Sequence, residues 1–370
     1  MITCRFCASR DGETVLDAGL QPAGDNFPLV DDRGPDALHP LRMWMCGACR
    51  LAQLTEDPTV PDEPRGREPE ALVRQARDAV QMLASTGYLT AGSSVVEFGS
   101  PHGGSWLDLI QEYGAVPCGE SAKADVLVDN IGMMHAADQA AALRERLARL
   151  APHGTAFFQY HSLATIVARG QWNALRHGHY AYYSTPALVT MLESVDLTPV
   201  TARWYPLYGG TVLLGARRGG APDGTVSRIA DEEEKVGVLD PARVRSLQHA
   251  CSTSSAALAT FIGAELVAGR RVAGYSAASR AVALLCTAGI GLADLFAVAD
   301  ASEEKWGRRL PGSRIPIVSP AQLVDERPDT VVLFVPDLLE EVRRALPQVE
   351  EWGGRWVVAE DLVGDEANAL

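Results

Sequence analysis

The chain has 370 residues, of which 47% are hydrophobic and 22% are charged. This length exceeds that of one ordinary domain, and the composition excludes a disordered or fibrous chain. The formal net charge of −14 disfavours nucleic acid as a partner, because proteins that bind phosphate backbones carry basic surfaces. No apolar run reaches the ~18 residues of a membrane span, and the first ten residues lack the apolar core of a secretory signal. We therefore expect a cytoplasmic protein without a membrane partner.

Residues 1–57 contain two Cys-x-x-Cys pairs separated by 38 residues, Cys4 with Cys7 and Cys46 with Cys49. Each pair places two thiolates on a tight turn, and two such turns complete a tetrahedral zinc shell with no open position. The segment is rich in Pro, Gly and Asp and has little apolar periodicity, so it can bury little apolar surface and needs a cross-link such as a bound metal to fold. We predict a structural Zn²⁺ site; a redox-active Cys-x-x-Cys pair and a chance occurrence of the two pairs are the alternative interpretations.

Residues 58–69 carry Pro and charge without periodicity and are predicted to be a linker. A helix is predicted over residues 70–85, followed by an apolar strand that reaches Glu97 and a turn with Gly99 and Gly103. This pattern is typical of the first βα unit of a Rossmann-like sheet, where glycine lets the backbone approach a ligand. The spacing E-x-G-x-x-x-G differs from the dinucleotide fingerprint and is more similar to the first motif of S-adenosylmethionine (SAM) methyltransferases.

The alternation of strands and helices continues after this turn, as expected for an α/β fold. Strands are predicted at residues 115–118, 125–130, 154–159, 197–204 and 211–215. A second α/β unit is predicted to begin at Arg271, with short strands near residues 295–298, 330–335 and 356–359. We therefore predict a zinc lobe over 1–57, a SAM-methyltransferase-like Rossmann domain over 70–218, a helical connector over 223–269 and a second Rossmann-like domain over 270–370.

The order of motifs along nearly the whole chain resembles that of the three-domain sugar C-methyltransferases of antibiotic deoxysugar biosynthesis. The matching pieces are the four cysteines, V-V-E-F-G-S-P-H-G-G (95–104), D-V-L-V-D-N (125–130), H-G-H-Y-A-Y-Y-S (177–184), Y-G-G-T (208–211), G-Y-S-A-A-S-R (274–280), K-W-G-R-R-L-P-G-S-R-I-P-I (305–317) and E-W-G-G-R-W-V-V (351–358). The resemblance implies an enzyme that uses SAM to methylate a keto-deoxysugar linked to a nucleoside diphosphate, usually dTDP.

The resemblance also implies a set of site residues. The cofactor-binding residues would be Glu97, Gly99, Gly103, Glu120 and Asn130, and the substrate-binding residues would be Tyr208, Tyr275 and Arg280. Methylation beside a ketone begins with removal of an α-proton, and histidine suits this task because its pKa lies near neutrality. By the family pattern His179 is the base, His177 is its companion, and Tyr182 contacts the sugar or the enolate.

Three departures from the family pattern bear on this reading. The family segment Y-H-E-H-x-x-Y is R-H-G-H-Y-A-Y here, so Arg176 stands for a Tyr and Gly178 for a Glu. Only residues 121–124 separate Glu120 from the next strand, which is too short for a parallel crossover. Either the sheet lacks a strand, or residues 115–118 belong elsewhere. Residues 58–69 also lack the aromatic side chains that cover SAM in the family.

A second class of function therefore stays open. A protein that no longer uses SAM could transfer a proton on a nucleotide-linked keto-sugar through His179, as an epimerase or isomerase, or could bind a ligand or partner without catalysis. Removal of a proton beside a carbonyl needs the base and not the methyl donor.

Overall fold

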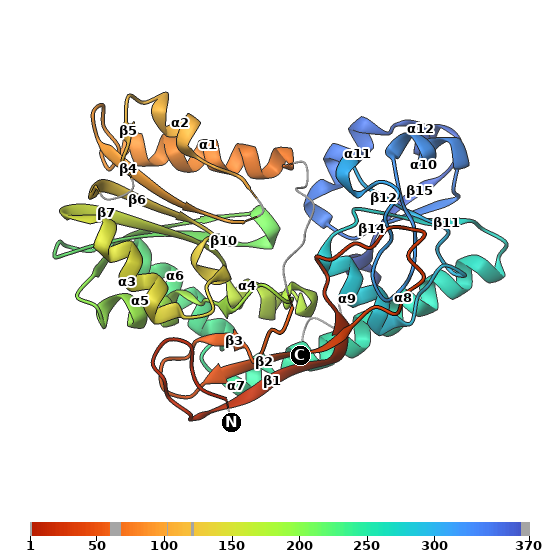
Figure 1. Cartoon of the computed structure of the whole chain (residues 1–370), viewed down its shortest axis with the longest axis horizontal. Helices are drawn as coiled ribbons and strands as arrows, with labels where there is room; N and C mark the ends of the chain where they lie inside the picture. Colours follow the sequence, from red (N-terminus) through yellow and green to blue (C-terminus); the bar gives the residue numbers. More distant parts are fainter. Residues whose placement is uncertain (1, 60–67, 102, 120–121, 364–370) are drawn as a thin grey trace.

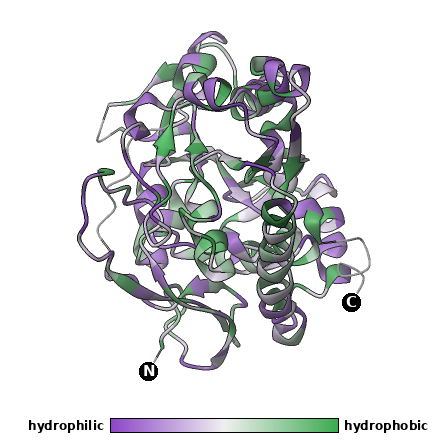
Figure 2. Cartoon of the chain, turned by 90° about the vertical axis from the view of Figure 1, so that its right-hand side faces the viewer, coloured by the Kyte–Doolittle hydropathy of each residue, from purple (hydrophilic) through white to green (hydrophobic). Residues whose placement is uncertain are grey.

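In the computed structural model, residues 2–59, 68–101, 103–119 and 122–363 are described, and they form three sheets with flanking helices (Figure 1). Most of the predicted linker 58–69 and the expected ribose ligand Glu120 lie outside the described residues. Figure 2 shows hydrophobic strands towards the middle of the molecule and hydrophilic residues on the outer helices.

The first sheet belongs mainly to the N-terminal lobe. It is antiparallel, in the order β1-β2-β3-β8, with strands β1 (Gly12–Pro22), β2 (Leu38–Cys46), β3 (Ala52–Leu54) and β8 (Ala181–Tyr182). The strand β8 comes from the middle of the chain, directly after the histidine segment. The N-terminal lobe is therefore tied by backbone hydrogen bonds to the segment in which the base was predicted.

The second sheet has the order β5-β4-β6-β7-β10-β9 among the described residues. Its strands are β4 (Ser94–Gly99), β5 (Val116–Pro117), β6 (Ala124–Asn130), β7 (Leu150–His161), β9 (Thr198–Tyr205) and β10 (Thr211–Arg217). The first four are mutually parallel, and β9 and β10 are antiparallel to their neighbours. This is the predicted Rossmann-like sheet.

Helices cover both faces of the second sheet (Figure 1). On one face lie α1 (Glu70–Ser85) and α2 (Leu107–Gln111), and on the other lie α3 (Gln139–Arg149), α5 (Thr185–Glu193) and α6 (Thr225–Val236). The apolar side of α1 supplies Ala76, Val80 and Leu83 to the core between it and the sheet. The predicted helix over 70–85 therefore forms, with one apolar side packed against the sheet.

The short connection after residue 119 resolves the question of the missing strand. The strand β5 is the sheet edge and pairs only with β4, and the chain then returns to β6 on the other side of β4. Among the described residues no strand lies beyond β5, because the connection is too short to hold another crossover. The sheet therefore lacks a strand, and residues 116–117 stay within it.

The third sheet is parallel throughout, in the order β13-β12-β11-β14-β15. Its strands are β11 (Val272–Tyr275), β12 (Val298–Ala299), β13 (Ile317–Val318), β14 (Thr330–Leu333) and β15 (Arg355–Val358). Its helices are α9 (Ser279–Ala288), α10 (Pro320–Glu326), α11 (Leu339–Ala345) and α12 (Gln348–Glu351). This is the second Rossmann-like unit that the sequence predicts.

Shorter elements complete the described chain. They are α4 (Leu163–Ala168), α7 (Pro241–Val244) and α8 (Ser246–Val267), with the 3₁₀ turns η1 (Met133–His135), η2 (Trp172–Ala174), η3 (Leu207–Gly209), η4 (Glu303–Lys305), η5 (Pro336–Leu338) and η6 (Ala359–Leu362). Residues 241–267 form the one described helix that is long and apolar enough to cross a membrane by length and composition. Leu247, Leu258 and Ile262 of this segment are buried in a protein core that also includes β1 and α9, and 28% of its apolar window is buried.

A buried ion pair fixes the end of β6 that leads to the site. Asp129 is 1% exposed, and its carboxylate accepts hydrogen bonds from Arg146 Nε of α3 and from the Met133 backbone N–H of η1 (2.9 Å). Burial raises the pKa of Asp129, and the Arg146 guanidinium opposes that rise. The pair therefore holds α3 and η1 against the carboxyl end of β6.

We expect Arg146→Met to destabilise the protein by roughly 3–5 kcal/mol, because it leaves Asp129 charged and buried without its partner. The measurement is urea or thermal unfolding followed by circular dichroism. Arg144→Met on the exposed face of the same helix is the matched control. Equal unfolding curves for the two variants would contradict the role assigned to the pair.

Candidate active site

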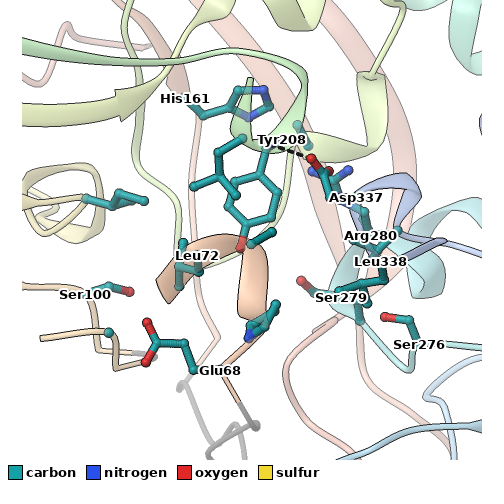
Figure 3. A pocket seen from close by; sticks show the side chains of 18 of the residues that line it. Glu68, Leu72, Ser100, His161, Tyr208, Ser276, Ser279, Arg280, Asp337 and Leu338 are labelled. Carbon is teal, nitrogen blue, oxygen red and sulfur yellow. Dashed lines mark hydrogen bonds between the residues drawn. The ribbon is translucent and has the colours of Figure 1, made fainter. Parts of the chain in front are cut away.

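A cavity of about 340 Å³ lies between the second and third sheets. Its walls are the segments that follow the carboxyl ends of the strands β4, β6 and β7 on one side and of β11, β12 and β14 on the other. In open parallel sheets, ligands bind at the carboxyl ends of the strands. Here two such sheets present these ends to one shared space, and Figure 3 shows side chains from both sides pointing into it.

The glycine loop after β4 is held in place by a chain of buried amides. Gln75 donates to Gln159 (2.8 Å), Gln159 donates to the Asn130 side chain (3.2 Å), and Asn130 donates to the carbonyl oxygen of Gly104. Gly103 and Gly104 have φ of 101° and 86°, values that favour glycine. A Cβ on Gly103 would project into open space, so the backbone itself faces the cavity. Of the expected cofactor residues, Gly103 and Asn130 line the cavity.

Glu97 has a different position from the one expected. Its carboxylate accepts hydrogen bonds from the Trp106 backbone N–H (2.7 Å) and from Ser105 Oγ (2.5 Å), and burial raises its pKa. It therefore fixes the start of α2 and is not among the residues that line the cavity. Gly99 ends β4 and forms a bridge with Ile131, and a Cβ built on it would meet no atom within 4 Å. The role of Glu97 and Gly99 in holding the cofactor stays a prediction.

The segment Arg176–His179 forms a tight turn, closed by a hydrogen bond from the His179 backbone N–H to the Arg176 carbonyl oxygen (3.3 Å). Gly178 occupies the third position with φ of 83°, a value that turns of this kind reserve for glycine. The turn brings the two outer side chains together, and Arg176 Nε donates to His179 Nε2 at 2.7 Å. The glycine that replaces the family glutamate is therefore a requirement of the turn.

The peptide groups of Gly178 are held from both sides of the site. Its N–H donates to Asp57 of the N-terminal lobe (2.5 Å), and its carbonyl oxygen lies 3.0 Å from His135 Nδ1. Because a carbonyl oxygen only accepts, Nδ1 of His135 carries the proton in this contact. The Tyr182 hydroxyl accepts from the Arg176 backbone N–H (3.0 Å) and donates to Ala174 O (3.3 Å). Tyr182 lines the cavity and also supports the turn.

His135 was not predicted as a site residue. It lines the cavity, its ring packs edge-on against that of His179 with centroids 4.6 Å apart, and its Nε2 lies 3.4 Å from Ser100 Oγ. His135 could have been predicted from the sequence, because it follows the carboxyl end of β6 by five residues and ligands bind at that end of a parallel sheet.

His177 does not share the site with His179, contrary to expectation. It is 4% exposed, its Nε2 contacts the Pro40 carbonyl oxygen of β2 at 3.2 Å, and burial lowers its pKa. Because Gly178 turns the chain between them, the two imidazole rings leave the turn on different sides. His177 packs on the N-terminal lobe and is absent from the cavity lining.

The three expected substrate residues all line the cavity. Tyr275 ends β11, and Arg280 lies in the first turn of α9 with its guanidinium 5.9 Å from the centre of the Tyr208 ring. Tyr208 has φ of 53°, an uncommon value for a residue with a side chain, and its N–H donates to Asp337 (3.0 Å). In Figure 3 this backbone contact places the Tyr208 ring across the cavity, beside Leu72 and Arg280.

Two further groups on the cavity wall have their charge set by their surroundings. His161 ends β7, and burial together with the nearby Arg280 lowers its pKa to about 3, so the ring is neutral. Lys305 is 6% exposed; its ammonium donates to Ala277 O (2.9 Å) and lies 3.8 Å from Asp300. Sequence analysis singled out neither residue as a candidate.

The four predicted zinc ligands form one cluster in the N-terminal lobe. All four Sγ atoms lie within 4.8 Å of one another, with Cys4 3.5 Å from Cys49 and Cys7 3.6 Å from Cys46. A tetrahedral shell with Zn–S bonds of about 2.3 Å separates its sulfurs by about 3.8 Å. The contact with Cys49 lowers the pKa of Cys4 to about 5 and raises that of Cys49. The donor set fits a closed structural zinc site.

Two family models match the chain. Residues 206–359 match the model described as "C-methyltransferase C-terminal domain", and residues 4–62 match the one described as "Putative zinc binding domain". The curated relative C-methyltransferase NovU of Streptomyces niveus is 27% identical over 402 aligned positions, which cover 96% of this chain and 94% of the relative. The chain is therefore similar to C-methyltransferases over nearly its whole length.

Solved structures give a weaker likeness. The 1,6-didemethyltoxoflavin-N1-methyltransferase of Burkholderia thailandensis, bound to S-adenosylhomocysteine, is 17% identical and covers 46% of this chain and 96% of its own, with a TM-score of 0.29. The magnesium protoporphyrin IX methyltransferase of Synechocystis PCC 6803, also bound to S-adenosylhomocysteine, is 14% identical and covers 42% of this chain and 90% of its own, again at 0.29.

These similarities, together with the four-cysteine cluster, support a SAM-dependent methyltransferase with a zinc-binding lobe. The residues of the chain fit both the zinc ion and the SAM cofactor. The four cysteines fit zinc by donor type and spacing. The loop at Gly103 and Gly104, with the Asn130 amide behind it, leaves backbone open to the cavity and fits a cofactor at the ends of β4 and β6.

We expect elemental analysis to find about one zinc per chain, and little or none in Cys46→Ser, because three thiolates no longer complete the shell. A chelator should lower the melting temperature of the native protein and leave the zinc-free variant unchanged. Cys118→Ser, outside the cluster, is the matched control and should keep the metal. Full zinc content in Cys46→Ser would contradict the assignment.

Proposed function

We propose that this methyltransferase transfers a methyl group to the carbon beside the ketone of a nucleoside-diphosphate-linked deoxysugar, with dTDP as the nucleotide, in antibiotic biosynthesis. The supporting observation is the shared cavity. A cofactor at the glycine loop and a substrate at the third sheet would meet in one space, beside the pair His135 and His179. The motif resemblance supports the sugar as the substrate class.

The third sheet offers a place for the diphosphate. The first turn of α9, a helix of ten residues, faces the cavity with Ser279 and Arg280, and Lys305 lies on the same wall. Helix N-termini and cationic side chains favour phosphate oxygens. The sugar end would then extend from this wall towards the histidines.

His179 is the proposed general base. Because its Nε2 accepts a hydrogen bond from Arg176, the neutral ring carries its proton on Nδ1, and Nε2 is the nitrogen that would take the α-proton of the sugar. The ring of His135 packs against it, and the hydrogen bond between His135 and Gly178 O fixes the geometry of the turn. SAM, when bound, supplies the methyl group that the resulting nucleophilic carbon accepts.

The cytoplasm is the proposed compartment. The seven cysteines are all free in the structure, and four of them form a cluster that fits a metal. Proteins of reducing compartments typically use cysteine in this way and not in disulfides.

Calorimetric titration with S-adenosylhomocysteine tests the cofactor half of the proposal. We expect micromolar binding, followed by methyl transfer to a dTDP-linked keto-sugar. Absence of binding at millimolar ligand, together with solvent deuterium entering the keto-sugar, would support the SAM-independent proton-transfer enzyme.

We expect His179→Ala to lower turnover by roughly 10²–10⁴, the usual effect of losing a general base. The readouts are the rate of methyl transfer and the rate at which solvent deuterium enters the sugar. His153→Ala, at an exposed position of β7, is the matched control. A near-native rate in His179→Ala would remove this residue from the mechanism.

A further inference from the structure

We propose that Arg176 is a catalytic residue that holds His179 Nε2 in the ligand-free protein and passes its hydrogen bond to the ketone oxygen of the bound substrate. Binding of the substrate would thereby release the base and place a cation on the oxygen where negative charge develops. This inference rests on the proposed function, since it assumes that a ketone binds beside His179.

Arg176 lies at the wall of the cavity, next to the proposed base. Its side chain lines the cavity and is mostly buried, with 21% of its surface exposed. The turn through Gly178 sets it directly beside His179, with 2.7 Å between Arg176 Nε and His179 Nε2. A base needs this lone pair to accept a proton, and in this structure the guanidinium donates a hydrogen bond to that same nitrogen.

The other contacts of Arg176 show how it could exchange one partner and stay in place. Its Nη1 donates to Ser279 Oγ of α9 and lies 3.5 Å from the Asp25 carboxylate of the N-terminal lobe. Asp25 is itself 8% exposed, so the charge of the guanidinium is balanced inside the protein. With Nη1 anchored to two other parts of the chain, the Nε side can change acceptor by a small rotation. A planar guanidinium offers five N–H donors in fixed directions, which suits this exchange.

The geometry of a ketone matches the pair of side chains. A ketone carries its oxygen and its α-hydrogen on adjacent carbon atoms, so a donor and a base that lie side by side can reach both at once. Arg176 and His179 are such a donor and base.

The step balances without any added reactant. His179 Nε2 takes the α-proton, the electron pair of the C–H bond forms the carbon–carbon double bond of the enolate, and the π pair of the carbonyl moves onto oxygen. The imidazole becomes a cation, and the oxygen becomes an anion that the Arg176 guanidinium stabilises. Donors that are already in place when charge develops give large stabilisation in a site that excludes water.

The test compares Arg176→Met and Arg176→Lys with the native protein, and Arg144→Met, exposed on α3, is the control. The first measurement is the rate of solvent deuterium entry into dTDP-4-keto-6-deoxyglucose. We expect kcat to fall by roughly 10²–10³ in Arg176→Met, the usual effect of losing one oxyanion donor, with a smaller change in KM. Arg176→Lys keeps the charge and should recover part of the loss, whereas a purely structural role would give no such recovery.

The second measurement follows the imidazole nitrogens of His179 by ¹⁵N NMR and needs no turnover. In the native protein we expect an Nε2 resonance shifted by hydrogen bonding, lost in Arg176→Met and altered when the keto-sugar binds. Identical His179 resonances in the native protein and in folded Arg176→Met would overturn the inference, as would equal exchange rates.

Failure of the proposed function would look different. The native protein would then not bind S-adenosylhomocysteine, whether or not deuterium enters the keto-sugar, while the His179 resonances would still decide whether Arg176 holds the base. Melting temperatures of all variants show which of them fold.

Discussion

The site depends on one constraint, the left-handed backbone of Gly178 in the turn Arg176–His179. Its peptide N–H is held by Asp57 of the N-terminal lobe, and its carbonyl oxygen is held by His135 after β6. Because these contacts fix the turn, the side chains of Arg176 and His179 must meet at its two ends. A residue with a side chain at position 178 would strain the turn, so the glycine and the neighbouring arginine form one structural unit.

The cavity follows from the way two parallel sheets face each other. Each sheet presents the carboxyl ends of its strands, where backbone N–H groups and helix N-termini converge. The contact between the Tyr208 backbone and Asp337 joins the two sides across this space, and it holds Tyr208 in its uncommon conformation. Strain of this kind persists where the surrounding structure determines it, and it is frequent at functional sites.

Much of the fold and part of the site could be predicted from the sequence. The helix over 70–85 and the cysteine cluster follow from local patterns, whereas the short connection after residue 119 left two strand arrangements open, and only the structure decides between them. Contacts across the chain could not be predicted in this way. The spacing between Glu97 and the glycines that follow it is the same whether the carboxylate binds a ligand or caps α2. In the structure the carboxylate accepts hydrogen bonds from Ser105 and Trp106 at the start of α2. His177 and His179 look alike in sequence, and only the turn between them separates their roles.

The zinc lobe contributes to the site without supplying a ligand to the proposed chemistry. Asp25 and Asp57 of this lobe contact Arg176 and Gly178, the strand β8 pairs with β3, and His177 packs on β2. A lobe with so little apolar surface to bury depends on the cysteine cluster to keep its fold. Loss of the metal would therefore loosen the carboxylates that hold the turn, and with them the distance between Arg176 and His179. In the proposed mechanism the metal would influence catalysis from a distance, because the lobe that it would stabilise contacts the histidine turn.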